Sequence, residues 1–272
     1  MARQLSEIYV YPIKSLGGIC LAEAQLTERG LAYDRRWMLV DERGFLTQRK
    51  LPRMAQLQVA LRYDHLEVQA PTGPAPLTVP LALKAIADQR TVPIWDDTVR
   101  AQPVGEDADT WFSEVLGHHC SLVYMPDESE RTAVGRVSGR SQAVSFADSY
   151  PILLIGQASL DDLNTRLANP VPMNRFRPNL VFTGGEPYEE DDWHAFTIGD
   201  TPAWAEKPCA RCTVVTIDQQ TAESSKEPLA TLSKYRRQGN KVLFGQNILY
   251  EAGPTVRVGD AIRIETYKSE FS

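Results

Sequence analysis

Residues 35–49 read RRWMLVDERGFLTQR, in which two short apolar runs flank a turn sequence. The turn is predicted at DERG, because Gly44 can adopt the positive φ that tight hairpin turns require. Residues 56–70, QLQVALRYDHLEVQA, predict a second hairpin, since apolar and polar residues alternate on both sides of Tyr63 and Asp64. Short strands at this spacing are typical of a small barrel or a sandwich.

More strands and a few helices are predicted further along, so the expected fold class is mixed α/β and β-rich. PILLIG (151–156) and NLVFTG (179–184) are unbroken apolar runs, as in strands that are buried on both faces. TVRVGDAIRIE (255–265) predicts another hairpin. The polar segment 127–141 contains two glycines, and we expect it to be a mobile connection between two halves.

Three helices are predicted from signals at their ends. The first covers about residues 107–116 and ends at Gly117, a residue type that suits the position after a helix. The second follows a capping arrangement at 159–162. The third has Pro228 at its first helical position and ends at Gly239.

The composition is that of an ordinary globular protein, with 272 residues of which 43% are hydrophobic and 24% are charged. This length allows one large or two modest domains, and we predict two, over residues 1–125 and 126–272, with a boundary uncertain by about ten residues. The net charge of −6 disfavours binding to nucleic acid or to anionic membranes.

Nothing in the sequence predicts a membrane or secretory location. No apolar run approaches the roughly 18 residues of a spanning helix, and the start, MARQLSEIYVYPIK, has no apolar signal core. Four cysteines are too few for a disulfide scaffold and fit a reducing compartment. We therefore expect a cytoplasmic protein.

Two of the four cysteines lie in KPCARCTVVTID, residues 207–218. A closed zinc site needs about four ligands, and the other candidates are Cys20 and the run His118-His119-Cys120. A thioredoxin-like dithiol begins a helix, whereas the β-branched run CTVVTID predicts a strand. A third alternative is a pair of small buried thiols at the start of a strand.

A fourth interpretation is a metal-bound thiolate. Lys207 and Arg211 lie beside the cysteines, and nearby cations favour thiolate over thiol. A thiolate suits a soft transition metal, and arginine binds phosphate through its forked donors, so a metal carried by an anionic cofactor fits this setting. Further cations and amides stand near predicted strand ends: Lys14, Arg35, Arg36, Arg49, Arg53, Asn174, Arg175, Arg177 and Asn179.

Eight segments together carry a family resemblance. They are YPIKSLGG, GLAYDRRWMLVDERG, SFADSYPILLIGQASLDDLN, NRFRPNLVF, KPCARCTVVTID, EPLATLSKYR, FGQN and VRVGD. They resemble the MOSC family, named for the C-terminal domain of molybdenum cofactor sulfurase. Within it the chain is most similar to the reductases of the YcbX and mitochondrial amidoxime reducing component type. Because the eight segments occur in order over nearly the whole chain, the resemblance is specific.

The resemblance implies an N-terminal β-barrel domain, a MOSC β-barrel domain with a few helices, and a pterin-type molybdenum cofactor between them. Cys212 matches the molybdenum ligand and is therefore the expected catalytic residue, which leaves Cys209 without a ligand role. Arg36 matches a cofactor-contacting arginine, with Arg35 as the alternative. The expected cofactor contacts are Lys14, Ser15, Arg35, Arg36, Arg49, Asp148, Ser149, Asn174, Arg175, Arg177 and Arg211.

The implied activity is molybdenum-dependent reduction of small N-hydroxylated substrates, such as hydroxylamines and amidoximes. The chain shows no four-cysteine iron–sulfur spacing and no ferredoxin domain like that of YcbX, so the electrons are expected from a separate ferredoxin-, flavin- or haem-type protein. The pyridoxal-phosphate domain of the sulfurases is also absent, and pyridoxal phosphate would enter only through a separate sulfurase. The alternatives are a module that carries the cofactor or sulfur without catalysis, and a member that binds nothing.

Three features are left outside the expected site. His118-His119 stands at a predicted helix end, where a histidine suits the helix dipole, and is interpreted as structural. The acidic run 189–192 is interpreted as a solvated turn rather than a metal site. The stretch 95–97, Trp-Asp-Asp, is either a turn or part of the cofactor cleft, and the sequence does not decide between them.

Overall fold

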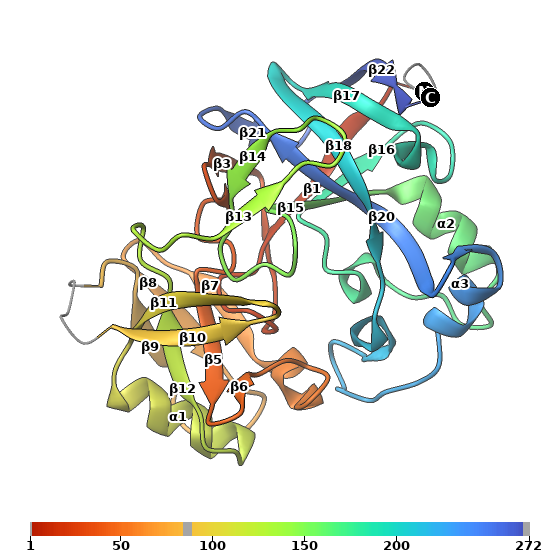
Figure 1. Cartoon of the computed structure of the whole chain (residues 1–272). Helices are drawn as coiled ribbons and strands as arrows, with labels where there is room; N and C mark the ends of the chain where they lie inside the picture. The colour runs from red at the N-terminus through yellow and green to blue at the C-terminus, as the bar shows by residue number, and fades with distance from the viewer. Residues whose placement is uncertain (1, 84–88, 269–272) are drawn as a thin grey trace.

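The computed structural model describes residues 2–83 and 89–268, which form two β-rich halves (Figure 1). The N-terminal half contains a five-stranded sheet in the order β10-β11-β12-β5-β6, a three-stranded sheet β7-β8-β9 and helix α1. Their bounds are β5 Trp37–Asp41, β6 Gly44–Phe45, β7 Gln58–Leu61, β8 His65–Gln69, β9 Leu77–Pro80, β10 Arg90–Ile94, β11 Asp97–Pro103, β12 Ser121–Tyr124 and α1 Glu106–Leu116. The two sheets and α1 enclose one apolar core, so this half is barrel-like, as predicted.

The two hairpins predicted for this half are confirmed. In the first, β5 pairs with β6 so that Asp41 lies opposite Gly44, whose φ of 116° requires glycine's freedom. In the second, β7 pairs with β8 across the turn at residues 62–64. Helix α1 ends before Gly117, which adopts a left-handed φ of 61°, as its sequence signal predicts.

The C-terminal half is built on a sheet in the order β2-β1-β16-β15-β20-β18-β17-β22, with β19 also paired to β20. Its strands are β1 Gln4–Val10, β2 Ile19–Leu21, β15 Ile152–Gly156, β16 Leu180–Thr183, β17 Trp193–Ile198, β18 Thr201–Ala210, β19 Arg237–Gln238, β20 Lys241–Tyr250 and β22 Ile262–Tyr267. Two short additions are β13 Thr132–Val134 with β14 Ser141–Ala143, and β21 Thr255–Arg257 with β3 Glu23–Thr27 and β4 Gly30–Leu31. As predicted, β15 and β16 are apolar and buried, and they pair in parallel.

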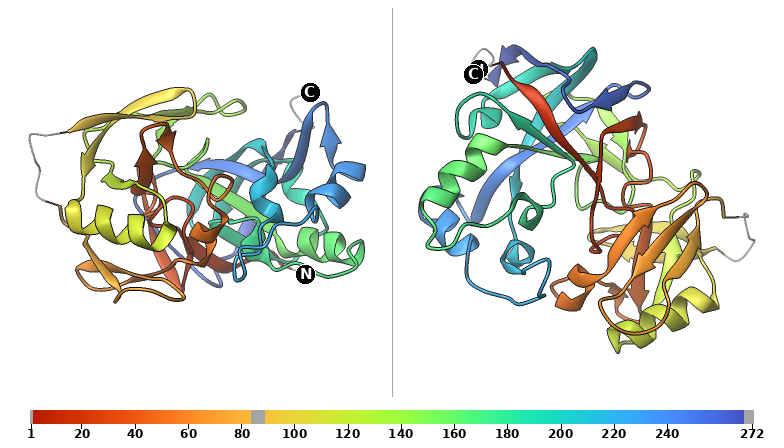
Figure 2. Two further views of the ribbon diagram at one scale, coloured as in Figure 1. Left: turned by 90° about the horizontal axis from the view of Figure 1, so that it is seen from below. Right: turned by 180° about the vertical axis from the view of Figure 1, so that it is seen from behind.

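The start of the chain belongs to the C-terminal half. Strand β1 pairs with β16, and β3 pairs with β21, so these two early strands pack against residues far along the chain. Figure 2 shows β1, in red, running along the sheet of the C-terminal half before the chain enters the other half. The domain ranges 1–125 and 126–272 remain a prediction. Strands β1 and β3 lie in the first range but pair with β16 and β21 of the second. This path also brings the residues after β1 to the boundary between the halves.

Several local predictions are wrong, for two reasons: a local side-chain contact in one segment and long-range strand pairing in another. Residues 212–218 are not a strand: β18 ends at Ala210, and Thr213–Thr216 forms a short 3-10 helix. The Thr216 hydroxyl donates to the Thr213 carbonyl at 2.8 Å and stabilises that turn. The predicted hairpin at 255–265 does not form, since β21 pairs with β3 and β22 pairs with β17.

The segment 127–141, predicted to be a mobile connection, does lie between the two halves, but it carries regular structure and buried contacts. It contains β13 and is held by the buried Arg131, which donates to the carbonyls of Ser145 and Ala147 at 2.8 and 2.6 Å. Gly239 does not end the third helix, α3 (Leu229–Tyr235), but lies in the turn between β19 and β20 with φ 59°. Pro228 precedes α3 as its N-cap rather than standing at the first helical position.

The acidic run 189–192 is not a solvated turn. Helix α2 (Gln157–Thr165) is preceded by Gly156, and Ser159 does not cap it. Instead, Ser159 accepts from the Tyr188 amide at 2.8 Å and donates to Glu190, which is only 1% exposed. Asp191 pairs with Arg236. The run therefore packs against β15 and β20 of the sheet, with Glu190 inside the protein.

Burial raises the pKa of Glu190 to about 7, although the Gly156 amide and the Ser159 hydroxyl oppose the shift. The folded protein therefore holds a proton that the unfolded chain has lost, and stability falls as pH rises from about 4.5 to about 7. Between pH 5 and pH 8, we expect the wild type to lose roughly 2–3 kcal/mol of unfolding free energy that Glu190→Gln keeps, so the variant should be more stable than the wild type at pH 8. Urea unfolding at the two pH values measures this difference. The exposed Glu186→Gln is the control, and a wild-type pH dependence retained in Glu190→Gln would contradict the assignment.

Candidate functional site

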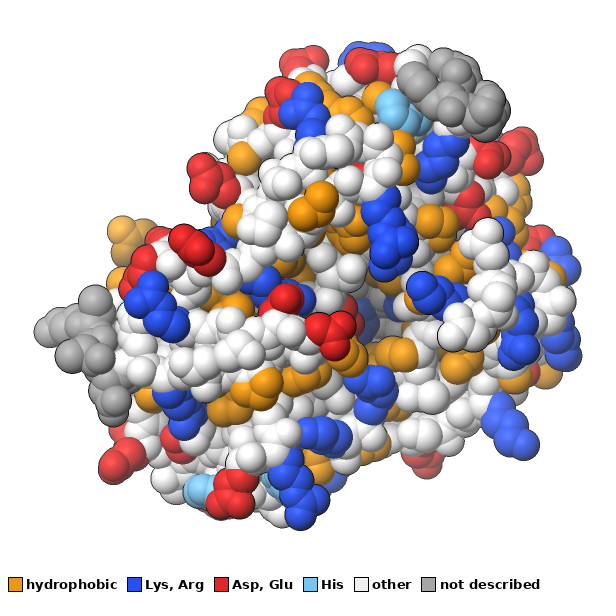
Figure 3. Space-filling model, in the orientation of Figure 1, with side chains coloured by type: hydrophobic (Ala, Val, Ile, Leu, Met, Phe, Trp, Pro, Cys, Tyr) orange, Lys and Arg blue, Asp and Glu red, His pale blue; other side chains and the backbone are white. Residues whose placement is uncertain are grey.

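A cavity of about 230 Å³, here called the central cavity, lies where the two halves meet. Figure 3 shows the hollow near the middle of the view, with Lys and Arg side chains around it. Its lining includes Lys14, Ser15, Arg35, Thr47, Arg49, Trp95, Asp148, Ser149, Tyr150, Arg177, Asn179, Lys207, Cys209, Arg211, Cys212 and Asn247. They come from both halves and from the segment between them, so only the folded chain assembles this site.

Two arginines that line the cavity contact one and the same aromatic ring. The guanidinium carbons of Arg35 and Arg177 lie 4.4 and 4.2 Å from the centroid of the buried Tyr11 ring. The negative faces of the ring reduce the cost of placing two like charges close together. Burial lowers the pKa of Arg177 to about 10. The Tyr11 ring therefore contacts two partly desolvated cations at the cavity.

Arg35 is fixed by a second contact, to a buried carboxylate. Its Nη1 donates to Asp34 Oδ2 at 2.6 Å and to Asn179 Oδ1 at 2.8 Å. Asp34 is 1% exposed, and its Oδ1 accepts from the Tyr11 amide at 2.8 Å. These contacts therefore tie the arginine to Tyr11, which follows β1, and to Asn179, which precedes β16.

Lys14 follows β1 and reaches into the same cavity. Its Nζ donates to the Phe146 carbonyl at 2.8 Å and pairs with Asp148, whose side chain is largely exposed. Burial lowers the pKa of Lys14, and Asp148 partly offsets this effect. Ser15, with φ 70°, turns the chain back after Lys14, and its carbonyl accepts from Gln48 at 2.8 Å.

Cys209 and Cys212 both line the cavity, on either side of Arg211. Arg211 Nη1 lies 3.0 Å from Cys209 Sγ, and its Nη2 donates to the Phe176 carbonyl at 2.6 Å. Its Nε is buried without a hydrogen-bond partner in the described part of the chain, as are ten other side-chain atoms. Cys212 is exposed to the cavity, and its thiol has no hydrogen bond among the described residues.

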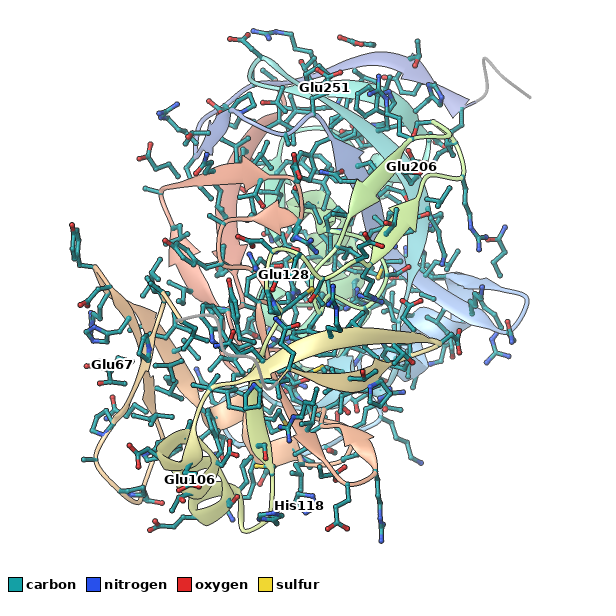
Figure 4. All side chains as sticks on the ribbon, turned by 60° about the vertical axis from the view of Figure 1, so that its left-hand side comes forward. Glu67, Glu106, His118, Glu128, Glu206 and Glu251 are labelled. Carbon is teal, nitrogen blue, oxygen red and sulfur yellow. The ribbon has the colours of Figure 1, made fainter. Side chains whose placement is uncertain are left out.

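The alternative interpretations of the cysteines can be compared with this geometry. Within residues 2–83 and 89–268, no three His, Cys, Asp or Glu side chains are grouped as a metal site would need, so the zinc interpretation has no support there. Cys209 lies near the end of β18 and Cys212 just after it, so neither thiol is at the start of a strand, and neither is fully buried. His118, labelled in Figure 4 near the end of α1, binds Asp41 at 3.0 Å and lies outside the cavity lining.

Most of the predicted site residues line the central cavity: Lys14, Ser15, Arg35, Arg49, Asp148, Ser149, Arg177, Arg211 and Cys212. Three predicted residues do not. Arg36 points away and binds Asp127 and the Met125 carbonyl, both at 2.6 Å. Arg175 pairs with Asp218 at 2.8 Å, and Asn174 lies in a separate surface pocket. Of the two arginines in DRRW, only Arg35 is therefore placed to contact a ligand in the cavity.

Some lining residues were not predicted as site residues. Trp95, which the sequence left undecided, lies at the turn between β10 and β11 and lines the cavity. Thr47, Tyr150 and Asn247 also line it and carry no local sequence signal. Glu206, labelled in Figure 4, accepts from the Val137 and Ser138 amides at 2.8 and 3.2 Å and so holds the turn between β13 and β14 beside Lys207.

Comparison with known proteins gives two domain matches. Residues 2–119 match the MOSC N-terminal beta barrel domain, and residues 141–263 match the MOSC domain. Among curated proteins, the chain is 35% identical to a rice molybdenum cofactor sulfurase over 268 residues, covering 91% of this chain and 32% of that protein. It is 33% identical to mouse mitochondrial amidoxime-reducing component 1, covering 95% of this chain and 81% of that protein.

A rat mitochondrial amidoxime reducing component 2 is 32% identical, with 95% of this chain and 82% of that protein covered. The chain thus spans about a third of the sulfurase and about four fifths of the two amidoxime-reducing components. Within the described residues, no helix has both the length and the apolar character needed to span a bilayer.

Proposed function

This chain belongs to the MOSC domain family, and we propose that it binds a pterin-type molybdenum cofactor in the central cavity and reduces N-hydroxylated compounds there. The observation that carries the proposal is that the exposed Cys212 thiol, the buried Lys14 and the partly buried Arg35 and Arg177 line a single cavity. Relatives of similar length are named as amidoxime-reducing components, which favours amidoximes as the substrate class.

The residues of the cavity fit such a cofactor. Its phosphate end is anionic, and Lys14, Arg35 and Arg177 present positive charge in a partly desolvated setting where attraction is strong. Its metal is soft enough to take a thiolate, and Cys212 supplies one without competing contacts among the described residues. The unpartnered Nε of Arg211 leaves a donor beside the expected ligand.

In this proposal, Lys14, Arg35 and Arg177 hold the phosphate end, and Cys212 provides a sulfur ligand to the metal. When bound, the cofactor supplies two-electron redox chemistry at the metal. An amidoxime takes up two electrons and two protons, its N–O bond breaks, and an amidine and water are released. The electrons would come from a separate donor protein of ferredoxin, flavin or haem type.

A second candidate function is a carrier of the cofactor or of sulfur, without catalysis of its own. One observation favours it: Cys209 lines the same cavity, 3.0 Å from the Arg211 guanidinium, and the metal-ligand role of Cys212 leaves this thiol unused. The sulfurase similarity is compatible with such a role.

The experiment that separates these functions is metal analysis joined to turnover. The protein is expressed in a host that makes the cofactor, and molybdenum and zinc are measured per chain. We expect close to one molybdenum per chain and reduction of benzamidoxime with reduced methyl viologen. Molybdenum without turnover would favour the carrier, zinc would revive the zinc site, and neither metal would overturn the proposal.

A further inference from the structure

Trp95 has no assigned role in the cavity that it lines. The ring is 42% exposed, unlike the buried aromatic residues of both cores. It meets Phe45 edge-on, with the ring centroids 5.1 Å apart, and the Arg49 guanidinium carbon lies 4.9 Å from its centroid. A large part of the indole therefore remains free to contact a molecule that enters the central cavity.

The backbone at Trp95 is held in an unfavourable conformation. Ile94 pairs with Asp97, so Trp95 and Asp96 form a two-residue hairpin loop. Trp95 has φ 54°, and a positive φ at the first position of such a loop normally calls for glycine. A bulky residue in this conformation costs stability, and such strain concentrates at sites of function. The turn alone therefore gives no reason for tryptophan at this position.

The loop is anchored on both sides of the ring, which fixes where the ring lies. Trp95 Nε1 donates to Asp148 Oδ1 at 3.2 Å, on the segment that also pairs with Lys14. Asp97 accepts from Arg131 Nε at 2.7 Å, and Arg131 in turn donates to the Ala147 carbonyl. A ring fixed before a ligand arrives loses little entropy on binding.

We propose that the Trp95 ring forms a substrate subsite at the central cavity, which selects planar, conjugated N-hydroxylated compounds over small aliphatic ones. This inference rests on the proposed function and adds the class of substrate. A flat π-system stacks on an indole, whereas a methyl group offers it little area.

The test compares benzamidoxime with acetamidoxime, which share the reacting group and differ in the aryl ring. Binding is measured by calorimetry, and kcat/KM is measured with reduced methyl viologen, for the wild type and for Trp95→Leu. We expect the preference of the wild type for benzamidoxime to fall about tenfold in Trp95→Leu, mainly through Kd and KM. Asp96→Ala, on the same loop but outside the cavity lining, is the matched control and should keep the preference.

A purely structural role for Trp95 is tested with Trp95→Gly. Glycine relieves the strained φ, so we expect an unchanged or higher melting temperature together with loss of the aryl preference. Equal losses for both amidoximes, or an unchanged preference in Trp95→Leu, would overturn the subsite. Selective binding without turnover would instead count against the reductase function and leave the subsite standing.

Discussion

Cys212→Ser is expected to reduce amidoxime turnover by more than about a hundredfold. Loss of an outer-shell partner of a metal ligand already costs about 10- to 100-fold, and Cys212 is the proposed ligand itself. Serine keeps the size of the side chain but replaces a soft thiolate with a hydroxyl that stays protonated near neutral pH. Because Cys212 is exposed and its thiol makes no hydrogen bond among the described residues, the substitution should leave the fold intact.

The control for this prediction is Cys209→Ser, which changes the other thiol of the same cavity. Its sulfur touches Arg211 but has no ligand role in the proposal, so turnover should fall much less. Molybdenum content, melting temperature and kcat with reduced methyl viologen are measured for both variants. Wild-type turnover in Cys212→Ser, or equal loss in both variants, would show that the two cysteines are wrongly assigned.

The cysteine motif also shows how far sequence reasoning reaches. The residue types of KPCARC, two thiols with Lys207 and Arg211 beside them, indicated a ligand-binding thiolate. Both thiols do line the cavity, together with Arg211. The strand predicted over the following residues was wrong, because local β-propensity does not register the Thr216 side chain closing a 3-10 turn. Chemistry was therefore easier to predict here than backbone conformation.

The cations illustrate a second limit. Lys14 and Arg177 stand near strand ends, and long-range pairing of β1 with β16 brings them to the same cavity. Sequence could not show that Arg35 and Arg177 both contact the Tyr11 ring, since the three residues come from three separate segments. Nor could it separate Arg35 from Arg36. Neighbours just before a strand point to opposite sides, and which side is the cavity depends on the packing of the two halves.

Arg35 and Arg36 each pair with a different aspartate, and removing the two aspartates should have very different effects on the free energy of unfolding. Arg35 pairs with Asp34, which is 1% exposed, whereas Arg36 pairs with Asp127, whose side chain is 84% exposed. Asp34→Ala leaves a buried guanidinium without its counter-charge and the Tyr11 amide without its acceptor. Breaking a buried pair from one side costs about 3–5 kcal/mol, a large share of the 5–15 kcal/mol typical of folded proteins.

Asp127→Ala should cost less than about 1 kcal/mol, because water screens an exposed pair and solvates the arginine left behind. Urea unfolding of the protein without cofactor measures both variants. If Asp34→Ala does not fold, Asp34→Asn provides the measurement, since its amide oxygen still accepts from the Tyr11 amide while the charge is lost. Similar losses at Asp34 and Asp127 would contradict the prediction. A loss of stability confined to the Asp34 variants would mean that Asp34, a buried carboxylate outside the cavity lining, is needed to hold the charge of Arg35 at the central cavity.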